Sequence, residues 1–200
     1  MSLHLPHLIL SCEQNSIFPF HQLLQSGFII KATVGCNIRE FLCNKQLVEN
    51  DYLDSRIQTI FLDGKPVDDV DSAIVKDGST LSLSAAMPGL VGATLRKGGF
   101  FAAMRTSISY LPGNADRNLY EGKVIIKLFN LVSKELGPEF LNRGIIIAGH
   151  TFSDLIKSNS DIIAKGFISA IQDGKQMGKD IFFKVKWEEK DEIFLQITSL

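Results

Sequence analysis

The residues best placed for chemistry surround His150, which follows an apolar run that ends at Ala148. Thr151, Ser153 and Asp154 come directly after it, where we expect a buried strand to turn into a helix. Such turns are frequent places for active sites. His150 and Asp154 are therefore candidate pocket residues of a small enzyme. The alternative is that Thr151 or Ser153 is a plain helix N-cap beside a solvated histidine.

Cysteine offers a second possible centre. Cys36 and Cys43 are seven positions apart, about two helical turns, so both side chains could lie on one helix face. Cys36 near the expected helix start could carry a reactive thiol, which makes it the third candidate pocket residue. The alternative is that both cysteines are small buried hydrophobic residues.

Motifs that would name a reaction or a cofactor are absent from the sequence. It contains no G-x-S-x-G, no P-loop, no G-x-G-x-x-G, no H-E-x-x-H and no CxxC pair. Cysteine and histidine do not cluster at zinc spacing either. We therefore expect no cofactor and no metal site.

Composition limits the partners. The chain has 200 residues, with 21 Lys plus Arg against 22 Asp plus Glu, so no net positive charge draws it to nucleic acid. Its apolar runs are shorter than the roughly 20 residues of a membrane helix, so we expect no membrane partner. Three cysteines argue against a disulfide framework, and the N-terminus lacks a basic signal region. We expect a cytoplasmic protein.

The first half predicts an α+β domain. The expected elements are a strand at 28–34, a helix opening at Asn37, a strand at 56–62, a short extended piece at 65–67 and a strand at 79–84. Asn37 and Glu40 have the spacing of a capping box. Asp63-Gly64 and Asp77-Gly78 are tight-turn signals between the extended segments.

The second half predicts a smaller α+β domain. The expected elements are a strand at 123–129, a helix near 131–136 broken by Gly137-Pro138, with a resumption to Leu141 as the alternative to its end there, a strand at 145–148, a helical pattern over 154–172 and a C-terminal β-hairpin of strands 179–187 and 192–198. The polar segment 111–118 is the candidate linker. We therefore expect a domain over 1–113, with an N-terminal lead-in, and a second over 119–200.

The segments Asn37 to Leu42, Ile60 to Val67 and Val75 to Leu83 resemble the ubiquitin-like β-grasp fold, and more narrowly the small sulfur-carrier proteins of thiamin and molybdopterin synthesis. The resemblance covers about a third of the chain. It implies a β-grasp domain in the first half. Such carriers end in a flexible Gly-Gly whose carboxylate is adenylated and converted to a thiocarboxylate.

Gly98 and Gly99 follow Leu95-Arg96-Lys97 and look like the end of such a tail, but the chain continues to Leu200. Cleavage after Gly99 would be needed to make a carrier. The alternative is that Gly98-Gly99 turns a β-hairpin within the glycine-rich segment 87–110.

Three functions follow as hypotheses. The preferred one is a non-enzymatic binding or assembly module, with a protein partner or self-association through the apolar region from Met87 to Met104. The second is a sulfur-carrier precursor cleaved after Gly99. The third is a small enzyme centred on His150, Asp154 and Cys36, which requires these side chains to converge on one pocket.

Overall fold

Helices and strands follow one another along the computed structural model, which describes residues 5–44, 47–112, 117–187 and 191–199. The structure is mixed α and β, as the sequence predicted. The chain divides into two compact units. Unit 1 comprises Met1–Phe28 and Gly137–Leu200, and unit 2 comprises Ile29–Leu136.

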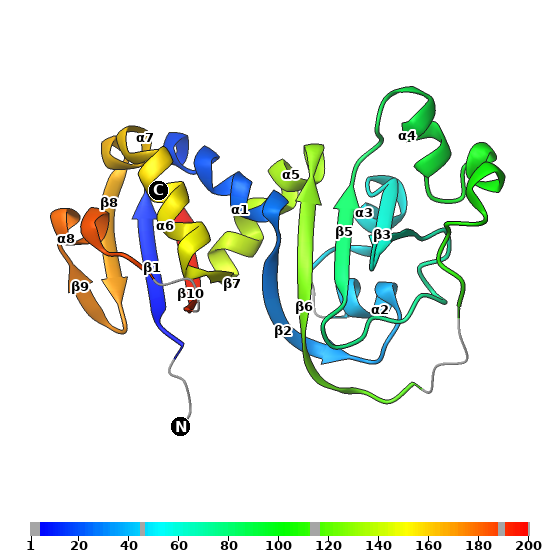
Figure 1. Ribbon diagram of the computed structural model, residues 1–200, viewed down its shortest axis with the longest axis horizontal. Coiled ribbons are helices and arrows are strands. Elements are labelled where there is room, and N and C mark those ends of the chain that lie inside the picture. Colours follow the sequence, from blue (N-terminus) through cyan, green and yellow to red (C-terminus); the bar gives the residue numbers. More distant parts are fainter. Residues whose placement is uncertain (1–4, 45–46, 113–116, 188–190, 200) are drawn as a thin grey trace. The chain divides into compact units, whose positions relative to one another are not determined.

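Unit 2 contains a mixed sheet with the strand order β4-β3-β5-β6-β2 (Figure 1). Its elements are β2 (Phe28–Val34), α2 (Ile38–Cys43), α3 (Asn50–Ser55), β3 (Thr59–Leu62), β4 (Lys65–Pro66), β5 (Thr80–Ser84), α4 (Gly89–Leu95), the 3-10 helix η3 (Phe100–Arg105), β6 (Tyr120–Phe129) and the start of α5 (Asn130–Arg143). β3 runs antiparallel to β5, and β5 runs parallel to β6.

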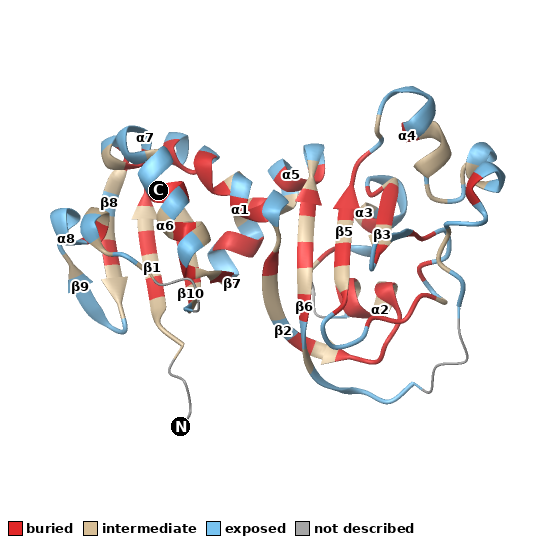
Figure 2. Cartoon of the chain, in the orientation of Figure 1, coloured by how far each residue is buried: buried red, intermediate tan, exposed pale blue. Residues whose placement is uncertain are grey.

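The core of unit 2 follows from alternation along its strands. Leu81 and Leu83 on β5 and Ile126 and Leu128 on β6 are fully buried. The residues between them, such as Ser82, are only partly covered, and Figure 2 shows the alternating bands along β6. One face of the sheet is therefore core, and the other remains partly open.

The capping box predicted at Asn37 is confirmed. The Asn37 side chain accepts from the Glu40 N–H, and the Glu40 carboxylate accepts from the Asn37 N–H. Gly35 before it has a φ of 84°, and a Cβ there would lie 1.9 Å from the Asn118 carbonyl oxygen. Only glycine has room for this contact and readily adopts such a positive φ, which is not an extended conformation. β2 therefore ends at the residue before it.

Unit 1 contains a second run of strands in the order β7-β10-β1-β8-β9. Its elements are β1 (His7–Cys12), η1 (Gln14–Ser16), η2 (Phe18–Phe20), α1 (His21–Ser26), the end of α5, β7 (Ile145–Ala148), α6 (Gly149–Ser158), α7 (Ser160–Lys165), β8 (Phe167–Gln172), β9 (Lys175–Met177), α8 (Lys179–Lys184) and β10 (Glu192–Ser199). β1 lies between β8 and β10 in Figure 1, antiparallel to the first and parallel to the second.

The two units do not follow the sequence boundary of 1–113 and 119–200. The N-terminal segment is not a lead-in to the first domain, because β1 pairs with the C-terminal strand β10 and belongs to unit 1. β6 belongs to unit 2, since it pairs with β5. Residues 113–116 of the predicted linker lie outside the described residues. Long-range strand pairing, which leaves no local sequence signal, sets these boundaries.

The helix break predicted at Gly137-Pro138 is wrong. α5 runs without interruption through Gly137 and Pro138. Its flanking turns bury Val132 and Leu141 completely, and this packing outweighs the cost of the proline. A Cβ on Gly137 would lie 2.5 Å from a Leu24 methyl group, so the glycine permits close packing against α1.

The predicted C-terminal hairpin is also wrong. Residues 179–184 form α8, whose Phe182 packs within 5.3 Å and 6.2 Å, ring to ring, of Phe167 and Phe152. The helical pattern predicted to continue to 172 ends at Lys165, and the last part forms strand β8 between β1 and β9. The hairpin in this region joins β8 to β9 instead.

The hairpin predicted at Gly98-Gly99 is wrong as well. The turn joins α4 to η3, so helical segments and not strands flank it. Gly98 has a φ of 59°, and its N–H donates to Asp68 Oδ1 at 2.9 Å. The exposed apolar residues on either side have no cross-strand partner, which a hairpin strand would need.

Candidate functional site

His150 and Asp154 lie one turn apart on α6 in unit 1 and line the same two hollows. A hollow of about 290 Å³ lies between them and α1, with Gln22 and Ser26 on the opposite wall. A larger one of about 590 Å³ faces α8 and Trp187. The structure therefore brings together two of the three predicted pocket residues.

The surroundings of His150 provide little for acid–base catalysis. The ring is exposed, and its Nε2 lies 3.3 Å from the hydroxyl of its own neighbour Thr151. Neither Thr151 nor Ser153 caps α6, whose N-cap residue is Ala148. The Ser153 hydroxyl instead accepts from the backbone N–H of Trp187 at 3.2 Å. The predicted N-cap alternative is therefore wrong, although the histidine is solvated as that alternative expected.

Cys36 lies in unit 2 and lines neither hollow. It is buried just before α2, with its Sγ 3.7 Å from the Thr33 carbonyl oxygen. Cys43 at the end of α2 is half-buried, and burial raises the pKa of its thiol. Both positions fit the hydrophobic alternative, because Cys36 is buried and the raised pKa of Cys43 disfavours its reactive thiolate.

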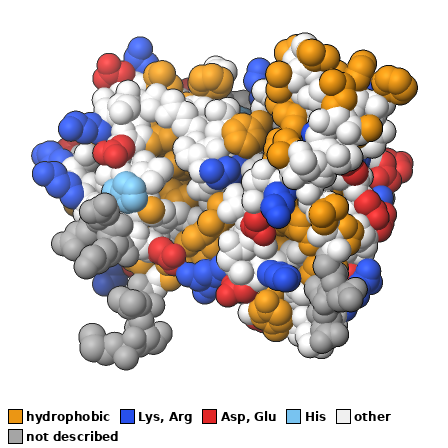
Figure 3. Space-filling view, turned by 45° about the vertical axis from the view of Figure 1, so that its right-hand side comes forward, with side chains coloured by type: hydrophobic (Ala, Val, Ile, Leu, Met, Phe, Trp, Pro, Cys, Tyr) orange, Lys and Arg blue, Asp and Glu red, His pale blue; other side chains and the backbone are white. Residues whose placement is uncertain are grey.

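The α4–η3 surface gathers five large exposed apolar side chains of unit 2. We define it by its large exposed side chains, which are Leu90, Val91, Phe100, Phe101 and Met104. Phe100 is 92% exposed and Met104 71%. In the space-filling view of Figure 3, hydrophobic side chains gather at the upper right, where α4 lies. A cluster of this kind is typical of a surface that another molecule covers.

The basic side chains beside the α4–η3 surface donate hydrogen bonds to other groups of unit 2. The Arg105 side chain is only 4% exposed and forms an ion pair with Asp68 at 2.6 Å. Its Nε also donates to the Thr94 carbonyl at 2.6 Å. Arg96 donates to the Gln58 side chain, and Lys97 Nζ donates to the Leu53 carbonyl. The surface therefore presents mainly apolar groups.

Gly98 and Gly99 lie at the edge of this surface. Gly98 is exposed and Gly99 is half-buried. The Gly99 N–H donates to the Arg96 carbonyl at 3.1 Å, and Gly99 is the residue from which η3 begins. The two glycines form an anchored turn within the chain.

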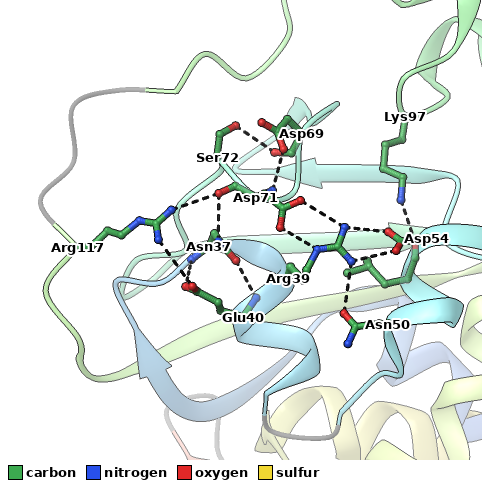
Figure 4. A network of polar contacts seen from close by, with 11 residues as sticks. Asn37, Arg39, Glu40, Asn50, Asp54, Asp69, Asp71, Ser72, Lys97 and Arg117 are labelled. Atoms are coloured by element: carbon green, nitrogen blue, oxygen red, sulfur yellow. Dashed lines mark hydrogen bonds and ion pairs between the residues drawn. The ribbon is translucent and has the colours of Figure 1, made fainter.

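A polar network connects α2, α3 and the loop that carries Asp71 (Figure 4). Arg39 donates to Asp54 at 3.0 Å and 3.1 Å and to Asp71 at 2.8 Å. These bonds raise the pKa of the guanidinium and lower that of the Asp54 carboxyl. Arg117 lies 3.7 Å from Glu40 in an exposed ion pair. The charges satisfy one another, so we read the network as structural.

A third hollow, the sheet pocket, lies on the open face of the unit 2 sheet and encloses about 510 Å³. Its wall is formed by two rows of strand residues, Phe61–Ser82–Lys127 and Thr59–Ser84–Phe129, in which each residue pairs with its neighbours. Met87, Leu95, Gly64 and Asn130 complete the lining. Sequence reasoning missed this pocket. The signal available was the alternation of serine with leucine along β5, which marks an open face but not what surrounds it.

No protein-family model, curated protein or solved structure matches the chain. Within the described ranges, no helix has the length and apolar character needed to cross a membrane. Among the same residues, no group of three His, Cys, Asp or Glu side chains is placed to hold a metal ion.

Proposed function

We propose that the protein is a non-enzymatic assembly module, and that its α4–η3 surface binds the same surface of a second copy of the chain. The observation that carries the proposal is the exposure of Phe100 and Met104 beside three further large apolar side chains. Burial of such side chains favours association by roughly 1.5–3 kcal/mol each when complete.

The charge pattern supports a second copy as the occupant. A two-fold interface places the same patch against itself, so it works best when the patch carries no unpaired charge of one sign. Arg105 is paired with Asp68, and Arg96 and Lys97 are bonded back to the Gln58 side chain and the Leu53 carbonyl of the same unit. Interface cores are depleted in charged residues for the same reason.

We further propose that unit 2 carries a β-grasp domain. The support is the order of elements that the resemblance implied: β2, a capped α2, β3, the Asp63-Gly64 turn, β4 and β5. β6 adds a strand beside β5 that the resemblance did not include. β-grasp domains serve as adaptors and ligand binders as well as carriers, so this fold is compatible with an assembly role.

Sedimentation equilibrium of the full chain tests the assembly proposal. We expect a dimer for the natural sequence and a monomer for the double variant Phe100→Ser/Met104→Ser. Ile181→Ser is the matched control, because Ile181 is 59% exposed but lies on α8 in unit 1. It should remain dimeric.

A natural sequence that is monomeric at all concentrations contradicts self-association. An identical shift in the control variant contradicts the assignment to the α4–η3 surface. If the natural sequence binds a different protein and the double variant does not, the binding-module proposal stands. That protein, and not a second copy of the chain, then covers the α4–η3 surface.

The two other functions stay predictions. A carrier precursor predicts a species ending at Gly99 in the intact mass of the protein from its native cells. Because Cys36 lines neither hollow, the small-enzyme hypothesis is left with His150 and Asp154, and it predicts that His150→Ala and Asp154→Ala each abolish turnover.

A further inference from the structure

The sheet pocket combines an apolar lining with one charged side chain. Phe61, Phe129, Met87 and Leu95 supply apolar walls. Among the described residues that line it, only Lys127 is charged. Hollows of a few hundred Å³ with mostly apolar walls and a few placed polar groups are typical of small-molecule sites. A ligand that fits must therefore be largely apolar.

Lys127 sets the charge of that ligand. Lys127 lies within β6, where it pairs with Ser82 on β5. The pairing of the two strands therefore fixes the position of its Cα. Within the described part of the chain it forms no ion pair. A half-buried lysine that lines a mostly apolar hollow favours an anion as its partner.

Thr59 adds a second unsatisfied donor. Its side chain is 1% exposed, and its hydroxyl has no hydrogen-bond partner among the described residues. A buried hydroxyl without a partner costs roughly as much as a lost hydrogen bond, so such groups are rare unless something else satisfies them. Its neighbour in the row, Ser84, is satisfied, because its hydroxyl accepts from the Asn130 amide at 2.9 Å.

We propose that the sheet pocket binds a small amphipathic carboxylate. The carboxylate lies at Lys127 and accepts hydrogen bonds, and the apolar part lies against Phe61, Phe129, Met87 and Leu95. A single lysine matches a single negative charge. This proposal does not depend on self-association, since the α4–η3 surface is defined by other residues.

Isothermal titration of the full chain with decanoate tests the proposal, with decanol and decyltrimethylammonium as the uncharged and cationic probes. We expect saturable one-to-one binding of decanoate and binding of the other two that is weaker by about tenfold or more. Lys127→Gln should weaken decanoate binding by about tenfold and leave decanol binding unchanged.

Two matched variants locate the site. Lys31→Gln removes an exposed lysine of β2 in the same unit and should leave decanoate affinity unchanged. Phe100→Ser/Met104→Ser should also leave it unchanged, because neither residue lines the pocket.

Three results would overturn the proposal. They are the absence of saturable decanoate binding, equal affinities for decanoate and decanol, and a Lys127→Gln variant that binds decanoate as tightly as the natural sequence. Loss of binding in the Phe100→Ser/Met104→Ser variant would also overturn it, since the probe would then occupy the α4–η3 surface.

Discussion

Two regions of unit 2 are each held by an arginine, and they differ in what they leave for other molecules. Arg39 is 29% exposed and is surrounded by carboxylates that are themselves largely in water. Arg105 is 4% exposed and holds a segment that has no acidic residue of its own from Ala85 to Gly113. The first region neutralises its own charge and presents a polar surface. In the second region Arg105 pairs with the Asp68 carboxylate, and the apolar side chains of the region remain exposed.

This difference teaches that charge density in the sequence does not mark the surface available for binding. The region around Arg39 is rich in charge, yet its carboxylates are taken up by the guanidinium, which donates to Asp54 and Asp71. The α4–η3 surface has few charged residues, and those are bonded within the unit.

The largest effect should come from Arg105→Met. Removing the buried guanidinium takes the ion pair from Asp68, which keeps only its bond from the Gly98 N–H, and leaves the Thr94 carbonyl without this donor, so we expect the free energy of unfolding to fall by about 3 kcal/mol. Urea denaturation measures it. If the free energy of unfolding falls no more than expected for an exposed ion pair, burial does not make Arg105 more important for stability than Arg39.

Arg39→Met should cost about 1 kcal/mol, because exposed ion pairs are screened even when they form a network. Raising the salt concentration should reduce the stability that Arg39→Met loses, because salt screens exposed charges. It should barely change the stability that Arg105→Met loses, because Arg105 is buried. Urea midpoints at low and high salt measure both. Equal salt dependence in the two variants would contradict the comparison.

A third exposed cluster, in which Tyr52 on α3 and Arg56 directly after it donate to Glu135 on α5, should give the smallest effect. The hydrogen bonds from Arg56, and then from Tyr52, lower the pKa of Glu135 from 4.5 to about 2. A carboxyl whose folded pKa is lowered stabilises the fold above its unfolded pKa and loses this contribution as the pH falls.

Glu135→Gln should therefore lower the urea midpoint slightly at pH 7, and the difference from the natural sequence should shrink between pH 4.5 and pH 2. Urea denaturation over this pH range measures it, with Glu139→Gln on the same helix as the control. A difference that does not change with pH would mean that the charge of Glu135 contributes nothing.

The sequence predicted well where the signal is local. The capping box at Asn37, the Asp63-Gly64 turn and the alternation along β5 each depend on residues within a few positions of one another, and each is present. It predicted poorly where distant residues decide. The sequence predicts a strand where the structure has α8, because the apolar pattern of this segment is short and its aromatic packing on Phe167 cannot be inferred from the segment itself.

The candidate sites divide in the same way. His150 and Asp154 were brought together because residues four apart on a helix share a face, which the sequence alone determines. The sheet pocket combines β3, β5, β6 and α4, and no local pattern announces it.

The sequence by itself determined the mixed α and β character and the capped helix after the first strand of unit 2, because backbone propensity and side-chain capping act over a few residues. The tertiary structure alone decided that the N-terminal strand pairs with the C-terminal one, that α5 continues through Pro138, and which apolar side chains stay exposed on α4 and η3. These outcomes depend on burial between segments far apart in the chain, and such burial outweighs local preference.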